Sequence, residues 1–339
     1  MQSDCLKNLC YGIPKAELHV HIEGTFEPEL IFLLANRNNI KIPYESIEQL
    51  RQKYIFQNLQ EFLDIYYFAC TVLIKEDDFS DLMYAYLSKA HSQGLVYAEV
   101  FFDPQSHTKR GISFETVLFG LKKGIERGYK EFGIEVNLIM CLLRHLSEEE
   151  GLETLKEAAP YKNEILAIGL DSSEVGNPPE NFKKLFQEAS LQGYRLCAHA
   201  GEEGTHEYVS GALDVLSTER IDHGYNSKDS TDLLKRLAQS RVPLTLCPIS
   251  NKKLMVCTDL TKYPLRLFLE ENVLATINSD DPSYFSGYIG DNYYEVSAAL
   301  NLTKEEIVKL AKNSFEATFL HQDRKNYYIN KIDEFLADN

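Results

Sequence analysis

The sequence predicts an α/β fold in which eight parallel strands alternate with helices and close into a barrel. Eight short apolar runs are spread along the 339 residues, as expected for parallel strands that are buried on both faces. Segments with a helical spacing of apolar residues separate most of these runs. Ionisable residues directly follow four of the runs, at the end of the strands where barrels carry their chemistry. Together these features predict a (β/α)8 TIM barrel.

The predicted strands are short and largely apolar. In chain order they span residues 16–22, 96–102, 135–143, 165–170, 195–200, 220–223, 243–247 and 274–278. Helices are predicted between them where apolar residues recur every three to four positions. Examples are residues 114–132, 180–192, 229–240 and 265–272.

Two segments depart from a minimal barrel. The connection between the first two strands is a long helical insertion with patterns at 28–36, 59–73 and 78–93. An insertion at this end of a barrel is expected to cover the site as a lid. Extra C-terminal helices are predicted at 291–300, 304–314 and 324–336, on the outside of the barrel. We expect a single barrel domain over residues 1–339, with its core at about 12–322 and the helical lid at about 25–94.

The composition excludes several classes of function. The formal net charge of -16 opposes binding to nucleic acids and to anionic membrane surfaces. No apolar run reaches the roughly 18 residues of a membrane span, and residues 1–11 lack the pattern of a secretory signal. Seven widely spaced cysteines without a C-x-x-C pair are typical of a reduced, cytoplasmic protein. A small neutral ligand remains compatible with this composition.

Histidines and carboxylates gather at the carboxyl ends of four predicted strands. They are His19 and His21 on the first, His199 and Glu202 on the fifth, His223 on the sixth, and Asp280 and Asp281 on the eighth. Because residues two apart on a strand point to the same face, His19 and His21 can both face one ion. With His199 and Asp280 they form a nitrogen and oxygen set that suits zinc.

Each of these motifs has an ordinary explanation when it is taken singly. An H-x-H pair alone indicates a metal in roughly one case in three. A lone histidine is more often part of the core or the surface, and an Asp-Asp pair alone can form a turn or a helix cap. Their joint occurrence at four strand ends favours the metal site. We assign no chemistry to the other histidines, which are His91, His107, His145, His206 and His321.

Three further residues suit a hydrolytic reaction at such a metal, which activates water near neutral pH. Glu202 lies three residues beyond His199, where it is placed to move protons between water and a substrate. His223 is placed to stabilise the attacking oxygen, and Asp281 to hydrogen-bond the substrate.

Six short segments also carry a family resemblance. They are PKAELHVHIEG at 14–24, GLDSSE at 169–174, HAGEEG at 199–204, RIDHG at 220–224, CPISN at 247–251 and NSDDP at 278–282. As a set they resemble the adenosine and adenine deaminases of the amidohydrolase superfamily, over residues 14 to about 321. The resemblance implies one Zn²⁺ per chain, held by His19, His21, His199 and Asp280.

The resemblance implies further roles for individual residues. Glu202 would shuttle protons and His223 would act on the zinc-bound hydroxide. For the substrate, it implies that Asp281 contacts the purine N7 and that the backbone N–H of Gly169 meets the N3 side.

Within this superfamily the chain is more similar to the adenine deaminases of bacteria and fungi. EVFFDPQSHTKRG at 99–111, GLDSSEVGNPP at 169–179 and NSDDPSYFSGY at 278–288 carry this similarity. Nucleoside-using relatives tend to have an aspartate at the position of Glu23, placed for the ribose 5′-hydroxyl. The longer glutamate is expected to occupy the place of the sugar. The implied reaction is the hydrolysis of adenine to hypoxanthine and ammonia, in purine salvage or nitrogen catabolism.

Three alternatives are weighed against this prediction. In the first alternative the substrate is adenosine or an N6-substituted adenine. The ratio of kcat/KM for adenine to kcat/KM for these compounds distinguishes it. A zinc cytidine deaminase needs H-x-E followed by P-C-x-x-C, and no P-C-x-x-C occurs. The third alternative is a non-catalytic purine-binding protein. Because all the catalytic residue types are present, such a protein would need a defect that the sequence does not reveal. The expected partner is a small purine base and not a nucleic acid or a membrane. The sequence is compatible with a homo-oligomer and does not specify the oligomeric state.

Overall fold

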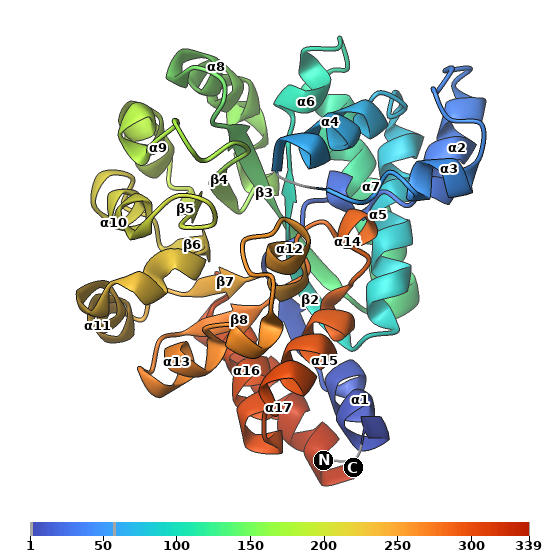
Figure 1. Ribbon diagram of the computed structural model, residues 1–339. Coiled ribbons are helices and arrows are strands. Elements are labelled where there is room, and N and C mark those ends of the chain that lie inside the picture. Colours follow the sequence, from blue (N-terminus) through green and yellow to red (C-terminus); the bar gives the residue numbers. More distant parts are fainter. Residues whose placement is uncertain (1–2, 57–58, 339) are drawn as a thin grey trace.

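The computed structural model describes residues 3–56 and 59–338 and contains an eight-stranded parallel barrel (Figure 1). Each strand pairs with the next in the chain, in the order β1 to β8. The strands are β1 (Lys15–Glu17), β2 (Leu95–Phe102), β3 (Glu135–Leu143), β4 (Ala167–Asp171), β5 (Arg195–Ala200), β6 (Arg220–His223), β7 (Leu244–Leu246) and β8 (Ala275–Ile277). The predicted (β/α)8 barrel is confirmed.

The first strand is shorter than predicted, because its second half pairs with two neighbours in turn. After Glu17, the N–H of Leu18 donates to the side chain of Asn278 at 2.8 Å. Val20 then forms a parallel bridge with Asp280, and His21 forms one with Phe101 of β2. This alternate pairing closes the barrel and brings the segment after β1 against the segment after β8.

The outer layer consists of helices that follow the strands (Figure 1). They are α7 (Phe114–Phe132), α8 (Glu148–Ala158), α9 (Lys183–Leu191), α10 (His206–Val215), α11 (Thr231–Ser240), α13 (Leu265–Glu270) and α16 (Lys304–Glu316). The longest of these, α7, has the predicted bounds. Ser113 caps its first turn by accepting from the N–H of Thr116, and Gly133 ends it with a φ of 70°.

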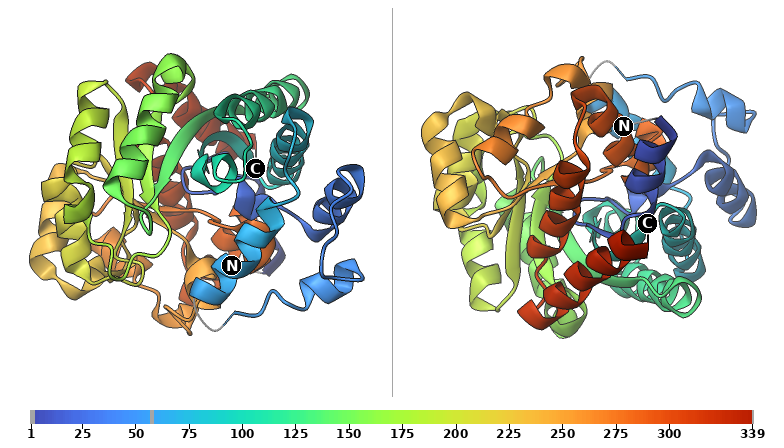
Figure 2. Two further views of the ribbon diagram at one scale, coloured as in Figure 1. Left: turned by 90° about the horizontal axis from the view of Figure 1, so that it is seen from above. Right: turned by 90° about the horizontal axis from the view of Figure 1, so that it is seen from below.

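The described residues of the insertion after β1 form four α-helices, which lie in different parts of the fold. They are α2 (Pro28–Arg37), α3 (Ile47–Arg51), α4 (Leu59–Cys70) and α5 (Glu76–His91). Helix α5 packs along α7 in the outer layer, where a Cβ on Gly120 would lie only 2.5 Å from the carbonyl oxygen of Glu76. Helices α2 and α3 extend to one side of the barrel (Figures 1 and 2). Among the described residues of the insertion, those that line the cavity described below belong to α4.

Three further short helices follow β2, β7 and β8, and three longer ones lie near the two ends of the chain. They are α1 (Ser3–Gly12), α6 (Gln105–Thr108), α12 (Pro248–Lys253), α14 (Pro282–Phe285), α15 (Ile289–Leu300) and α17 (Gln322–Asp338). Helix α1 was not predicted; it packs on α15, where the Tyr11 hydroxyl donates to Asp291. None of the helices in the described ranges has the length and apolar character of a membrane span.

Candidate active site

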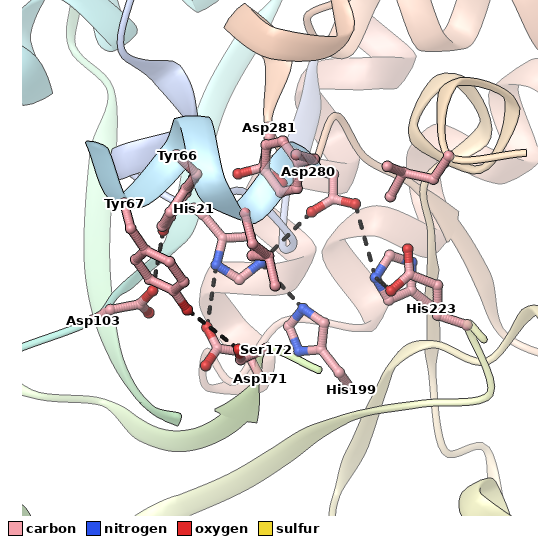
Figure 3. A pocket seen from close by; sticks show the side chains of 14 residues that line it. His21, Tyr66, Tyr67, Asp103, Asp171, Ser172, His199, His223, Asp280 and Asp281 are labelled. Atoms are coloured by element: carbon pink, nitrogen blue, oxygen red, sulfur yellow. Dashed lines mark hydrogen bonds and ion pairs between the residues drawn. The ribbon is translucent and has the colours of Figure 1, made fainter. Parts of the chain in front are cut away.

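A cavity lies at the carboxyl ends of the strands (Figure 3). Its polar lining comes from strand ends and consists of His21, Asp103, Asp171, Ser172, His199, Glu202, His223, Asp280 and Asp281. Helix α4 adds Phe62, Leu63, Tyr66 and Tyr67, and Leu254 completes the lining. The cavity therefore combines one charged wall with one aromatic wall.

The four predicted metal ligands converge at the floor of this cavity. The Nε2 atoms of His21 and His199 lie 3.1 Å apart. Oδ1 of Asp280 lies 3.4 Å from Nε2 of His19 and 3.6 Å from Nε2 of His21. Atoms about 2.1 Å from a zinc ion are roughly 3.4 Å apart in a tetrahedral site. The spacing of these four side chains therefore fits a shared zinc ion.

An unsatisfied nitrogen supports the same interpretation. Nε2 of His19 is buried and has no hydrogen-bond partner within the described residues. A buried polar atom without a partner costs roughly 1–3 kcal/mol, so such atoms usually have a ligand or a water molecule. A metal ion between His19, His21, His199 and Asp280 would satisfy this nitrogen.

Two of the site residues have an unusual backbone conformation. His223 and Asp280 have φ values of 67° and 66°, in the left-handed region that residues other than glycine seldom adopt. Asp280 is held there by two backbone hydrogen bonds of 3.0 Å, one donated to the carbonyl of His19 and one accepted from the N–H of His21. Such strain persists where the surroundings fix it, and it is common at functional sites.

The second ring nitrogens of His19 and His21 face polar side chains, whereas Nδ1 of His199 has no hydrogen-bond partner within the described residues. Nδ1 of His21 lies 3.4 Å from Asp171, and Nδ1 of His19 lies 2.9 Å from the hydroxyl of Thr245. The same hydroxyl donates to Asp222 at 3.2 Å, and the other oxygen of Asp222 lies 3.9 Å from Nδ1 of His199. Partners of this kind fix the orientation of ligating imidazoles.

Glu202 and His223 face each other beside Asp280. Oε2 of Glu202 is 3.5 Å from Nε2 of His223, which in turn is 3.8 Å from Oδ2 of Asp280 (Figure 3). Burial and the charge of Asp280 raise the pKa of Glu202 well above its usual range. Burial and the neighbouring His19 lower the pKa of His223 to about 3, so its imidazole is neutral. The two side chains are therefore placed for proton transfer beside Asp280.

Asp281 presents a second buried carboxyl to the cavity. Burial and the charge of Asp280 raise its pKa well above the usual range. Its Oδ1 is buried and without a hydrogen-bond partner in the part of the chain that the structure describes. A protonated carboxyl in this position can donate to an acceptor atom of a bound ligand.

Two predicted substrate contacts do not line the cavity. The Cα of Gly169 faces the barrel interior, where an added Cβ would lie 2.5 Å from the sulfur of Cys141. Asp171 and Ser172, further along the same strand, reach the cavity instead. Glu23 is buried behind the cavity wall, where its Oε1 accepts from the N–H of Asp103 at 3.2 Å.

His107, for which the sequence predicts no role, contacts Glu23 behind the cavity wall. Its Nε2 lies 2.8 Å from Oε1 of Glu23, and its Nδ1 lies 2.9 Å from Nη2 of Arg110. Because a guanidinium can only donate, Nδ1 accepts, and Nε2 of the neutral ring donates to Glu23. His107 therefore holds the carboxylate of Glu23 in a fixed position.

Asp103 and Asp171 are cavity residues that the sequence analysis missed. Asp103 follows β2 and accepts from the hydroxyl of Tyr66 at 3.0 Å, and Asp171 is the last residue of β4. Both lie at the carboxyl ends of predicted strands, so the rule that identified His19 and His199 also applies to them. Tyr66 and Tyr67 had no comparable signal, because their positions depend on how α4 folds over the barrel.

Comparison with known proteins identifies the family. A sequence profile of the adenosine deaminase family matches residues 14–335. The chain belongs to the adenosine deaminase family. The resemblance inferred from the six motifs is thereby confirmed.

Relatives within the adenosine deaminase family match the chain over almost its whole length. The adenine deaminase of Acinetobacter baylyi is 53% identical over 326 residues, which are 96% of this chain and 98% of the relative. The adenine deaminase of Geotalea uraniireducens is 51% identical over 344 residues, which are 99% of this chain and 97% of the relative.

Solved structures of the family share the fold. The crystal structure of adenine deaminase from Arthrobacter aurescens has a TM-score of 0.94 and 45% sequence identity, and it covers 96% of this chain and 100% of that chain. A zinc-bound amidohydrolase from Burkholderia ambifaria has a TM-score of 0.87 at 22% identity, covering 100% of this chain and 96% of that chain. At this lower identity the likeness shows a common fold alone.

Proposed function

We propose that this chain hydrolyses adenine to hypoxanthine and ammonia, using one zinc ion held by His19, His21, His199 and Asp280. One observation carries the proposal: three imidazole nitrogens and a carboxylate oxygen converge beside two buried carboxyls, Glu202 and Asp281, that have unpartnered oxygens. Relatives named adenine deaminase, with 53% and 51% identity, support adenine as the substrate.

Zinc bound by these four side chains would supply an activated water molecule for attack on C6 of the purine. Glu202, whose pKa is raised by burial and by the charge of Asp280, donates its proton to the ring nitrogen next to the attacked carbon. The carboxylate that remains takes a proton from the attacking water and passes it to the amino group, which leaves as ammonia. His223, neutral and 3.5 Å from Glu202, holds the attacking oxygen by a hydrogen bond.

The purine is oriented by groups around the rest of the cavity. Asp281, whose pKa is raised by burial and by the charge of Asp280, donates a hydrogen bond to N7, which is an acceptor, when its carboxyl is protonated. The aromatic side chains of α4 pack against the base and exclude water from it. The contact of the backbone N–H of Gly169 with the N3 side stays a prediction, since Gly169 is absent from the cavity lining.

Glu23 lies behind the cavity wall, so it restricts the substrate to the free base through the cavity residues Asp103 and Tyr66, which it contacts. Three contacts support this role: His107 at 2.8 Å, the N–H of Asp103 at 3.2 Å and the hydroxyl of Tyr66 at 3.5 Å. A carboxylate held in this way cannot swing aside for a ribose without losing its partners, and this loss penalises the nucleoside.

Product analysis tests the proposal. Purified protein incubated with adenine should release hypoxanthine and ammonia in equal amounts, and adenosine and N6-methyladenine should react far more slowly. Rapid turnover of either of these compounds in preference to adenine would assign a different substrate. Binding of adenine without any ammonia release would indicate a non-catalytic purine-binding protein.

A further inference from the structure

The carboxylate of Glu174 receives four consecutive backbone N–H groups from the loop that carries Glu202. The N–H of Gly201 donates to Oε1 at 2.6 Å. The N–H groups of Glu202, Glu203 and Gly204 donate to Oε2 at 3.0, 3.0 and 2.9 Å. Glu174 follows β4 and is 1% exposed, so the four N–H groups of this loop replace the water that its carboxylate loses on burial.

The loop has residues that permit this close wrapping. Gly201 has a φ of 72°, which is costly for residues with a Cβ. A Cβ on Gly204 would lie 2.7 Å from Oε1 of Glu174, closer than atoms approach without a shift. The two glycines therefore allow the 201–204 loop to fold around the carboxylate.

Two other side chains donate to backbone carbonyls of residues 199–204. Asn226, which follows β6, donates from Nδ2 to the carbonyls of Glu202 at 3.0 Å and Gly204 at 2.8 Å. Arg144, which follows β3, donates to the carbonyl of His199 at 2.7 Å. The N–H and the carbonyl of Glu202 are thus both fixed by side chains outside the loop.

We propose that Glu174 is a positioning residue, which fixes the backbone of Glu202 so that its carboxyl faces His223 and the bound purine. The inference rests on the proposed function of Glu202. Glu174 does not line the cavity, so it acts through the loop and not on the substrate. A carboxyl that transfers protons must lie within hydrogen-bond reach of both partners, and a misplacement of 1 Å can reduce the rate about 10²-fold.

The direct test is Glu174→Gln, which keeps the size of the side chain but replaces one oxygen with an amide NH2 that cannot accept. At least one of the four N–H groups then loses its partner. We expect kcat for adenine to fall about 10²-fold, with little change in KM and with the same zinc content per chain. Glu203→Gln is the matched control, because it removes an exposed carboxylate from the same loop and leaves all four N–H bonds in place. It should keep the wild-type rate.

A double-mutant cycle separates positioning from general damage to the fold. If Glu174 acts through the carboxyl of Glu202, adding Glu174→Gln to Glu202→Gln should lower kcat/KM by less than about threefold further, because coupled residues are not additive. A full second loss of about 10²-fold would overturn the inference. So would loss of zinc from the Glu174→Gln single variant.

A second variant keeps the inference testable if Glu174→Gln does not fold. Asn226→Ala releases the opposite side of the 201–204 loop and should also lower kcat with zinc retained, and a wild-type rate would contradict the inference. Wild-type protein that does not deaminate adenine would overturn the proposed function instead. In that case amide hydrogen exchange still tests the contacts of Glu174, since residues 201–204 should exchange slowly only while its carboxylate is present.

Discussion

The Nε2 atoms of His21 and His199 lie 3.1 Å apart, although 178 residues separate the two histidines in the chain. The two nitrogens converge from opposite sides of the barrel floor, within reach of His19 and Asp280. Two imidazole nitrogens that face each other at this distance either share one proton or bind one cation. The carboxylate oxygen beside them favours the cation.

The ligand assignment predicts the effect of removing single side chains. His19→Ala and Asp280→Ala should each lower both zinc content and activity, by more than the roughly 10–100-fold that loss of an outer partner of a ligand costs. His206→Ala is the control, since His206 lies at the start of α10 and does not line the cavity. Elemental analysis and the initial rate with adenine check the prediction. Full zinc content in His19→Ala would remove His19 from the ligand set.

Glu202 should behave as a catalyst and not as a ligand. Glu202→Gln preserves the shape of the side chain but removes the acidic proton, so zinc should stay bound. General acid–base catalysis contributes about 10²–10⁴-fold, and kcat should fall by at least this amount because one group serves more than one proton transfer. Zinc content and single-turnover rates measured on the same sample test this. Loss of zinc together with activity would show that Glu202 is a ligand.

Adenine should be used at least tenfold to a hundredfold better than adenosine. This estimate follows from the roughly 1–3 kcal/mol cost of leaving a buried polar group unpaired when a sugar displaces Glu23 from its partners. Glu23→Asp shortens the side chain and withdraws it from His107, so the ratio of kcat/KM for adenosine to that for adenine should rise. An unchanged ratio would show that Glu23 does not set the preference for the base.

Lys15 should make stability depend on pH above neutrality. Burial lowers the pKa of Lys15 from 10.5 to about 7, although Cys10 and Glu17 oppose the shift, and its Nζ donates to the carbonyl of Gln93 at 2.6 Å. Between these two pH values the unfolded chain binds a proton that the folded chain does not. The free energy of unfolding should therefore rise with pH in this window, by up to about 1.4 kcal/mol per unit from this group.

Lys15→Met provides the comparison for this pH effect. The variant lacks the titrating group, so its stability relative to the wild type should be highest near pH 6 and should decline as the pH rises to 9. Urea denaturation of both proteins at several pH values measures the difference. Parallel stability curves would contradict the lowered pKa of Lys15.

The fold could be predicted from the sequence largely because local patterns determine it. The bounds of α7, β3, β5 and β6 agree with the predicted segments, and of these α7 and β3 have the clearest apolar patterns. The first strand was overestimated, because its apolar run continues while its hydrogen bonds switch from β2 to Asp280. Hydrophobic periodicity reports burial, and it does not report which neighbour a strand pairs with.

The candidate site was predictable where it consists of residues at strand ends. His19, His21, His199, Glu202 and Asp280 satisfy this rule, and so do Asp103 and Asp171, to which the rule was not applied. The contacts of Glu174 with the 201–204 loop and of His107 with Glu23 could not be predicted, because they join loops that are brought together only by the closed barrel. Gly169 was assigned from its motif alone, and a motif does not specify which side of a strand faces the cavity.

The central claim is that adenine deamination depends on zinc at the site formed by His19, His21, His199 and Asp280. The most direct measurement is a titration of chelated protein with zinc, in which the zinc bound per chain and the initial rate with adenine are followed together. The chelated protein should keep its circular dichroism spectrum and lose its activity, and the rate should rise in proportion to bound zinc and saturate at one ion per chain. Chelated protein that deaminates adenine at the full rate would contradict the account.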